Sequence, residues 1–219
     1  MISACSNSLA STCPPRGVCV ATIALAVFLC GCVKPPPAVS LSGSWPSEPS
    51  DFGKVTHNWT RQGRIMHYEE PVLEVFATVK SPEWRAALVN RSAKRERLSA
   101  TEKAALAATH QKSAQEGYEV QLLVTTYDRR ENDLAKQRRS IWSLSLLDDA
   151  GRRVRPTSVK RDRRPRRVIR SDFPRFGDFA EAYIARFPRD VELFRQGARR
   201  FSLIMSSHRG SVELVWRGK

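Results

Sequence analysis

The side chains best suited to chemistry are few in this sequence, and they are widely spaced. No two of the four histidines (His57, His67, His110 and His208) have the spacing of metal ligands. The chain has no Gly-rich phosphate loop, no Gly-x-Ser-x-Gly elbow and no Ser-x-x-Lys sequence. We therefore expect no catalytic residue, no metal and no cofactor. A hydrolase whose site follows no familiar motif is the alternative.

The most acidic loop is DRREND, residues 128–133. The oxygens of Asp128, Glu131, Asn132 and Asp133 are of the kind that Ca²⁺ prefers. Their spacing is not that of a calcium-binding loop, and the two arginines between them offset the negative charge. The pattern favours a polar loop between two strands, in which Asp and Asn side chains stabilise turns.

Basic residues give the strongest signal. The chain has a formal net charge of +15, and the segment 152–170 contains a single acid, Asp162, among ten basic residues: Arg152, Arg153, Arg155, Lys160, Arg161, Arg163, Arg164, Arg166, Arg167 and Arg170. Such a segment attracts anions, for example lipopolysaccharide phosphates, an anionic cell-wall polymer or an acidic protein. Specific nucleic-acid binding is not expected, because no aromatic residues alternate with the arginines.

An alternative explanation of the basic segment is structural. Pro156 and Pro165 favour an extended strand at a sheet edge, where exposed charge prevents unwanted pairing with other strands. The sequence leaves both explanations open.

All five cysteines lie within the first 32 residues, so they cannot cross-link the rest of the chain. Residues 17–29, GVCVATIALAVFL, have the length of the apolar core of a signal peptide and are too short to span a bilayer. Leu29-Cys30-Gly31-Cys32 then resembles the lipobox of bacterial lipoproteins, Leu-x-Gly-Cys. The resemblance implies that signal peptidase II removes residues 1–31 and that the Cys32 thiol carries a lipid. Stable anchoring needs two or more acyl chains, which this modification supplies.

The residues after Cys32 bear on location and organisation. In two-membrane bacteria, Asp after the lipidated cysteine retains a lipoprotein at the inner membrane; Val33 and Lys34 do not match, which implies the periplasmic side of the outer membrane. Residues 32–51 are rich in Pro and Ser and predict a flexible tether. Residues 52–219 are long enough for one folded domain.

Within this domain, apolar residues alternate with polar ones in several segments, which predicts half-buried strands. They are residues 71–80, 118–127, 142–147, 179–187, 201–205 and 212–216. The turn sequence at 207–210 predicts a terminal hairpin. Trp59, Trp84, Trp142 and Trp216 fall within these strand and helix patterns, so we expect them in the core.

Two helices are expected between the first two strands. Ser81-Pro82 is a helix start, and Ser99 with Glu102 forms a capping box before an Ala-rich run. We predict helices over 82–96 and 100–116, which would form a hairpin.

These patterns predict a mainly β fold, an antiparallel immunoglobulin-like sandwich with a helical hairpin inserted at about 82–116. The body also resembles uncharacterised lipoproteins of bacterial envelopes in VKSPEWRAA, in TTYDRRENDL followed by SIWSLSLLDDAGRRVRP, and in FAEAYIARFP. The resemblance implies a shared fold and no known activity. We expect a non-catalytic binding or scaffolding role in the cell envelope, with polyanion binding by residues 152–170 as the alternative.

Overall fold

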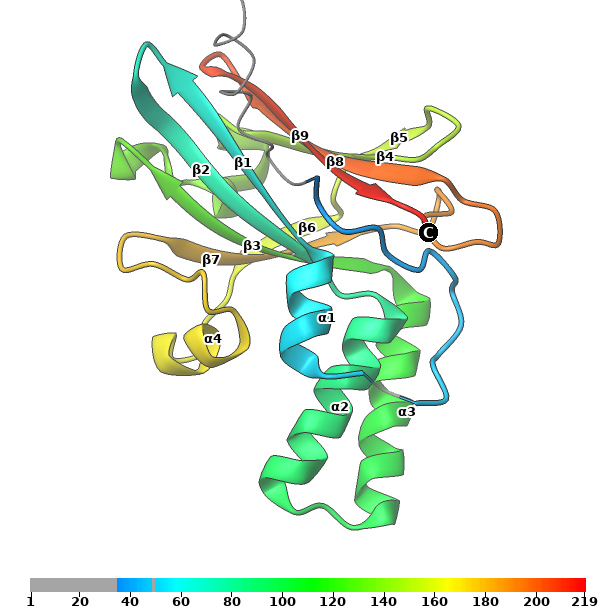
Figure 1. The fold of residues 1–219 in the computed structure, drawn as a ribbon. Coiled ribbons are helices and arrows are strands. Elements are labelled where there is room, and N and C mark those ends of the chain that lie inside the picture. Colours follow the sequence, from blue (N-terminus) through cyan, green and yellow to red (C-terminus); the bar gives the residue numbers. More distant parts are fainter. Residues whose placement is uncertain (1–34, 49) are drawn as a thin grey trace, which may run out of the picture. The chain divides into compact units, whose positions relative to one another are not determined.

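The computed structural model describes residues 35–48 and 50–219 (Figure 1). The described part contains two antiparallel sheets. The strands are β1 (Thr60–His67), β2 (Glu70–Val79), β3 (Tyr118–Thr126), β4 (Ser143–Leu147), β5 (Arg153–Val154), β6 (Ser158–Arg161), β7 (Glu181–Phe187), β8 (Arg200–Ser207) and β9 (Gly210–Arg217). The helices are α1 (Phe52–Trp59), α2 (Pro82–Glu96), α3 (Ala100–Glu116) and α4 (Arg166–Asp172), with short 3-10 helices η1 (Arg129–Glu131) and η2 (Leu134–Arg139).

The predicted strands and the mainly β class are confirmed. One sheet has the strand order β1-β2-β3-β7-β6, and the other has the order β5-β4-β8-β9. The terminal hairpin expected at 207–210 joins β8 to β9. Strand β1 lacks a regular alternation of apolar residues and was not predicted.

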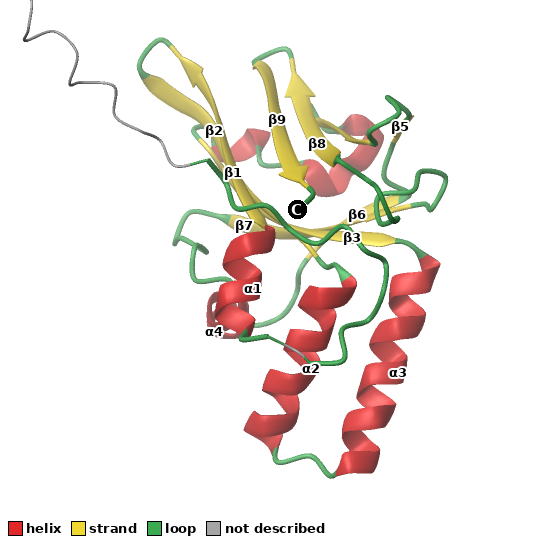
Figure 2. Cartoon of the chain, turned by 45° about the vertical axis from the view of Figure 1, so that its right-hand side comes forward, coloured by secondary structure: helices red, strands yellow, loops and turns green. Residues whose placement is uncertain are grey.

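The predicted helical hairpin is also confirmed, and its local signals explain its boundaries. The Ser81 hydroxyl accepts a hydrogen bond from the Trp84 amide at the start of α2. Ser99 and Glu102 form the complete capping box at the start of α3. Helices α2 and α3 follow the end of β2 and precede the start of β3, so they extend from one end of the five-stranded sheet (Figures 1 and 2).

The basic segment is only partly the extended edge that its prolines suggested. Strands β5 and β6 do lie at sheet edges, one in each sheet. After Pro165, however, the chain forms helix α4, which was not predicted. Pro165 precedes the first helical turn, where its fixed φ angle and missing N–H cost nothing. Ile169, Phe173 and Phe176 then become buried, and this packing favours a helix over an extended strand.

The two sheets meet where β1 packs against β9. Gly63 leaves no room for a side chain, because a Cβ atom there would overlap Val212 and lie 2.7 Å from Leu214. The Trp216 indole N–H donates to the Trp59 carbonyl oxygen at 2.9 Å. All four tryptophans that were predicted in the core are buried.

The segment that was predicted as a tether is partly folded. Val39 forms a parallel bridge with Gly218, and Val39 and Leu41 are buried. The Arg61 guanidinium donates to the carbonyl oxygens of Pro37 and Val215, both at 2.7 Å. Residues 37–41 of the predicted tether are therefore held against the domain, whereas residues 42–48 form no helix or strand. The pattern of Pro and Ser residues did not reveal that two apolar side chains would be buried.

Candidate functional site

A group of four ionisable side chains surrounds Glu119 on β3. One Glu119 carboxylate oxygen accepts from Arg85 of α2 at 3.0 Å and lies 3.5 Å from the Lys80 ammonium. The other accepts from Arg186 of β7 at 2.8 Å. His110 of α3 lies 3.5 Å from Arg85. Both oxygens of this carboxylate are thus bonded within the protein.

Burial shapes the protonation of this group. Burial lowers the pKa of Lys80, although the Glu119 charge opposes that shift. Burial would raise the pKa of Glu119, but the charges of Lys80, Arg85 and Arg186 outweigh it and lower that pKa below its usual range. Burial also lowers the pKa of His110, and the neighbouring Arg85 and Lys80 lower it further. The result is an internal ion-pair group that links the sheet to α2 and α3.

A second group of ion pairs connects β6 and α4 to helix α2. Arg164 donates to Asp162 at 2.6 Å and to Asp172 at 2.7 Å, and these bonds raise its pKa. Asp172 also lies 3.1 Å from Arg91 of α2. The Arg91 guanidinium donates to the Ser171 hydroxyl at 2.6 Å and stacks 4.4 Å from the Phe52 ring. These contacts fix α4 against α1 and α2.

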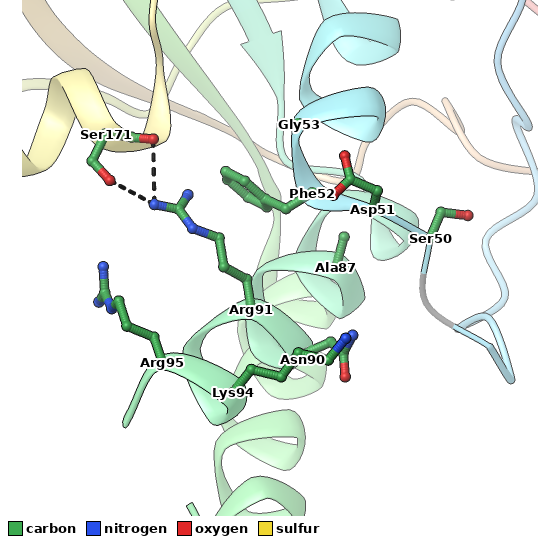
Figure 3. Close-up of a pocket in the computed structure, with 10 residues that line it drawn as sticks. All are labelled: Ser50, Asp51, Phe52, Gly53, Ala87, Asn90, Arg91, Lys94, Arg95 and Ser171. Atoms are coloured by element: carbon green, nitrogen blue, oxygen red, sulfur yellow. Dashed lines mark hydrogen bonds between the residues drawn. The ribbon is translucent and has the colours of Figure 1, made fainter. Parts of the chain in front are cut away.

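An open cleft lies where these three helices meet (Figure 3). Its volume is about 830 Å³. The lining residues come from the start of α1, from α2 and from α4, and they are Ser50, Asp51, Phe52, Gly53, Ala87, Asn90, Arg91, Lys94, Arg95 and Ser171. We call it the helix cleft. The Phe52 ring of this lining packs against Trp84, tilted by 55° with the ring centroids 5.4 Å apart, and Trp84 in turn stacks on Phe173 at 5.9 Å.

The charges that line the helix cleft are mostly positive. Arg91, Lys94 and Arg95 project from α2, and Asp51 is the only acid among the lining residues. Asp51 is already bonded, because its carboxylate accepts from the Lys54 amide at 2.9 Å as the cap of α1. Lys94 and Arg95 are exposed. The arrangement suits the binding of an anionic group and supplies no nucleophile beside a base.

The structure divides the ten basic residues predicted to bind anions into two sets. Five of them make side-chain bonds within the protein: Arg152, Arg161, Arg164, Arg166 and Arg170. Within the described part of the chain, the other five make no side-chain hydrogen bond or ion pair, and they are exposed: Arg153, Arg155, Lys160, Arg163 and Arg167. Arg167 lies on α4 one helical turn before Ser171, which lines the helix cleft.

The oxygens of the acidic loop are also used internally. The Asn132 side chain donates to the Val124 carbonyl and accepts from the Tyr183 hydroxyl, both at 2.8 Å. Asp133 accepts from Ser140 at 2.7 Å, and Glu131 pairs with Arg209 at 2.6 Å. Among residues 35–48 and 50–219, no three His, Cys, Asp or Glu side chains are grouped as metal ligands. The Asp128 carboxylate accepts from the Arg130 amide at 2.8 Å, which is the turn-stabilising bond that the sequence of the loop favours.

Sequence reasoning did not single out Arg91, Lys94 and Arg95. Their spacing places Arg91 and Arg95 one turn apart on the predicted helix, which is a detectable signal. What the sequence could not indicate is that α4 would face them, because α4 itself was not predicted. Cys32, the predicted lipidation site, lies outside the described residues.

No family model, no curated protein and no solved structure matches the chain. Within the described residues, no helix is both long and apolar enough to cross a membrane.

Proposed function

We propose that this protein is a lipid-anchored component of the bacterial cell envelope that binds another envelope component without catalysing a reaction. The Leu29–Cys32 lipobox directly after an apolar run carries the proposal. Its consequence is a mature chain that begins at Cys32 with acyl chains attached, at the periplasmic side of the outer membrane. The immunoglobulin-like arrangement of the two sheets is part of this proposal.

The anchor is tested by the intact mass of the protein from separated inner and outer membranes, compared with a Cys32→Ala variant. We expect a species that starts at Cys32, carries the added mass of acyl chains, and comes from the outer membrane. The variant should lack both the cleavage and the added mass. An unacylated wild-type chain would contradict the anchor, and acylated protein confined to the inner membrane would contradict the location alone.

The non-catalytic role is supported by the use of the ionisable side chains. Glu119, Asp162 and Asp172 are each occupied by arginines of the protein, so they hold elements together and are not free to act on a substrate. The hydrolase alternative would need one of them to be free beside an open cavity. The hydrolase alternative would be supported if the protein acted on envelope esters or glycans and if Asp162→Asn abolished that activity while the fold was retained.

The second candidate is polyanion binding, and the helix cleft favours it. Lys94 and Arg95 are exposed basic residues that line the cleft, and Arg167 is exposed on α4 one helical turn before Ser171 of the lining. A lipopolysaccharide phosphate or a cell-wall polymer offers the matching charge. This surface only partly overlaps the predicted 152–170 segment, since half of that segment's basic residues bind within the protein.

Polyanion binding is tested by co-sedimentation of the protein with lipopolysaccharide and with peptidoglycan sacculi at increasing salt. We expect binding that weakens with salt and that falls at least tenfold in a Lys94→Glu/Arg95→Glu/Arg167→Glu variant. A control variant reverses two exposed charges elsewhere, Lys112→Glu and Arg217→Glu, and should bind nearly as well as the wild type. Equal loss in both variants would indicate a non-specific effect of net charge.

A further inference from the structure

The exposed large apolar side chains of the described residues are all at one end of the five-stranded sheet. They are Met66, Tyr68, Tyr127 and Phe179, which are 50, 92, 74 and 68 % exposed. We call them the aromatic end. Large apolar side chains gathered on one surface commonly mark a contact site.

Strand pairing establishes that these residues share an end. Met66 lies near the end of β1, and Tyr68 lies in the β1–β2 turn that follows. Tyr127 follows β3 directly and donates its amide to the Val72 carbonyl at 3.1 Å, next to that turn. Phe179 precedes β7, whose first residue Glu181 pairs with Val124 near the end of β3. Tyr127, Phe179 and Pro71 also line one cleft of about 510 Å³.

Tyr68 has an unusual backbone for so exposed an aromatic residue. Its φ angle is +55°, in the left-handed region, where a bulky side chain costs free energy and where Gly or Asn is common. Packing in the fold compensates little for this, because the residue is almost fully exposed; its ring lies beside that of His67, with the ring centroids 4.6 Å apart. The conformation holds the phenol ring out toward solvent.

The described residues before Val39 approach from this same end. The bridge between Val39 and Gly218 is parallel, so the residues before Val39 run alongside β9 from the side of its first residue, Gly210. That side is the aromatic end, because a Cβ atom on Gly210 would touch Ile65, close to the β1–β2 turn. In Figures 1 and 2 the β1–β2 and β8–β9 turns both lie at the end opposite the α2–α3 hairpin.

Little chain separates the domain from the anchor. Four residues lead from Cys32 to Pro36, and they span at most about 14 Å when fully extended. A lipid on Cys32 would therefore keep the domain surface close to the bilayer. Because the anchor supplies a high local concentration, even a weak additional contact would be occupied.

We infer that the aromatic end lies on the surface of the phospholipid bilayer and turns the α2–α3 hairpin and the helix cleft away from it. Tyrosine is enriched at membrane interfaces because its ring is apolar and its hydroxyl stays hydrated. Exposed Arg129 and Arg130, which follow Tyr127 closely in the chain, would favour anionic lipids, but Glu69 in the β1–β2 turn and Glu70 at the start of β2 oppose them. The contact therefore depends chiefly on the aromatic side chains. The inference rests on the proposed acylation of Cys32.

The test uses the acylated full-length product in vesicles of phosphatidylethanolamine and phosphatidylglycerol. Because Cys32 would be the only cysteine after cleavage and its thiol would carry lipid, an introduced cysteine is the only free thiol. An environment-sensitive fluorophore is attached at Tyr68→Cys, at Tyr127→Cys or, as a control, at Thr101→Cys on α3. Spin-labelled lipid in the vesicles then quenches whichever label lies at the bilayer.

We expect the labels at positions 68 and 127 to be quenched severalfold more than the label at 101. Equal quenching at the three positions, in protein whose intact mass confirms acylation, would overturn the bilayer contact and leave the anchor intact. Absence of the acyl mass would overturn the anchor and this inference together.

A second variant separates contact from mere proximity. The label is placed at Arg130→Cys, beside the aromatic end, in the otherwise wild-type chain and in a chain that also carries Tyr68→Ser, Tyr127→Ser and Phe179→Ser. The three replacements should reduce quenching at position 130 severalfold while the acyl mass and the thermal unfolding curve stay unchanged. Unchanged quenching would show that the aromatic side chains do not hold the domain at the bilayer.

Discussion

Neutralising Glu119 should destabilise the protein far more than removing the cation next to it. The Glu119→Gln variant keeps the shape of the side chain and removes its charge. Arg85 and Lys80, with side chains 3 and 12 % exposed, would then be buried cations without a counter-charge. Breaking a buried ion pair in this way costs about 3–5 kcal/mol, and we expect about 3 kcal/mol here. Arg186 adds little to that figure because it is 61 % exposed and screened by water.

The Lys80→Met variant should behave in the opposite way. The Lys80 ammonium lies 3.5 Å from Glu119, which is a weak contact, and burial lowers its pKa. Glu119 keeps Arg85 and Arg186 when Lys80 is replaced. Replacing a poorly paired buried charge by an apolar side chain of similar length is often neutral or stabilising, so we expect a change within about 1 kcal/mol, or a gain.

The assay is urea unfolding of the protein in detergent, followed by the fluorescence of its buried tryptophans. The control is Glu213→Gln, which breaks an exposed pair with Arg200 at 3.4 Å and should cost less than about 1 kcal/mol. A cost for Glu119→Gln no larger than that of the control would refute the reasoning. An equal loss of unfolding free energy in Lys80→Met and Glu119→Gln would also refute it. Such a result would mean that the Lys80 ammonium stabilises the fold as much as the Glu119 carboxylate does.

The wild type and the Glu119→Gln variant also differ in how their stability depends on pH. The pKa of Glu119 is lowered in the folded protein, so the carboxylate stabilises the fold above its unfolded pKa of about 4.3. That contribution is lost as the pH falls below this value toward the lowered pKa. The difference in unfolding free energy between wild type and Glu119→Gln should therefore shrink in acid, and a constant difference down to the lowest pH at which the wild type stays folded would contradict this assignment.

Three further outcomes follow from single positions. Gly63→Ala should lower the unfolding free energy by about 1–3 kcal/mol, because the added methyl group would overlap Val212 at the contact between the sheets. Unchanged urea unfolding would show that the sheets can separate there at no cost. The unfolding free energy should decrease as the pH falls below about 6.5, because the lowered pKa of His110 keeps it neutral in the fold while the unfolded chain takes up a proton. The same pH dependence of unfolding in a His110→Gln variant would show that another group causes the decrease. Tyr68→Gly should leave thermal stability unchanged or raise it by up to about 1 kcal/mol, because glycine adopts the left-handed conformation without strain, and a clear loss would mean that the Tyr68 ring packs within the fold.

The sequence by itself determined the elements whose signals are local. The caps at Ser81 and Ser99 lie within a few residues of the helices that they start, and both helices have the predicted bounds. Strands such as β3 are visible because alternate residues are apolar. The regularity of these signals depends only on neighbouring residues, so no knowledge of the rest of the chain is needed.

Only the tertiary structure decided which polar side chains meet. Arg91 binds Ser171 across 80 positions of sequence, and Trp216 binds Trp59 across 157. The same long-range packing buries Val39 in the predicted tether and turns the end of the basic segment into α4. The charge of residues 152–170 was evident from the sequence. The sequence could not show which of these arginines stay free, because partners such as Asp172 come close to them only in the folded protein.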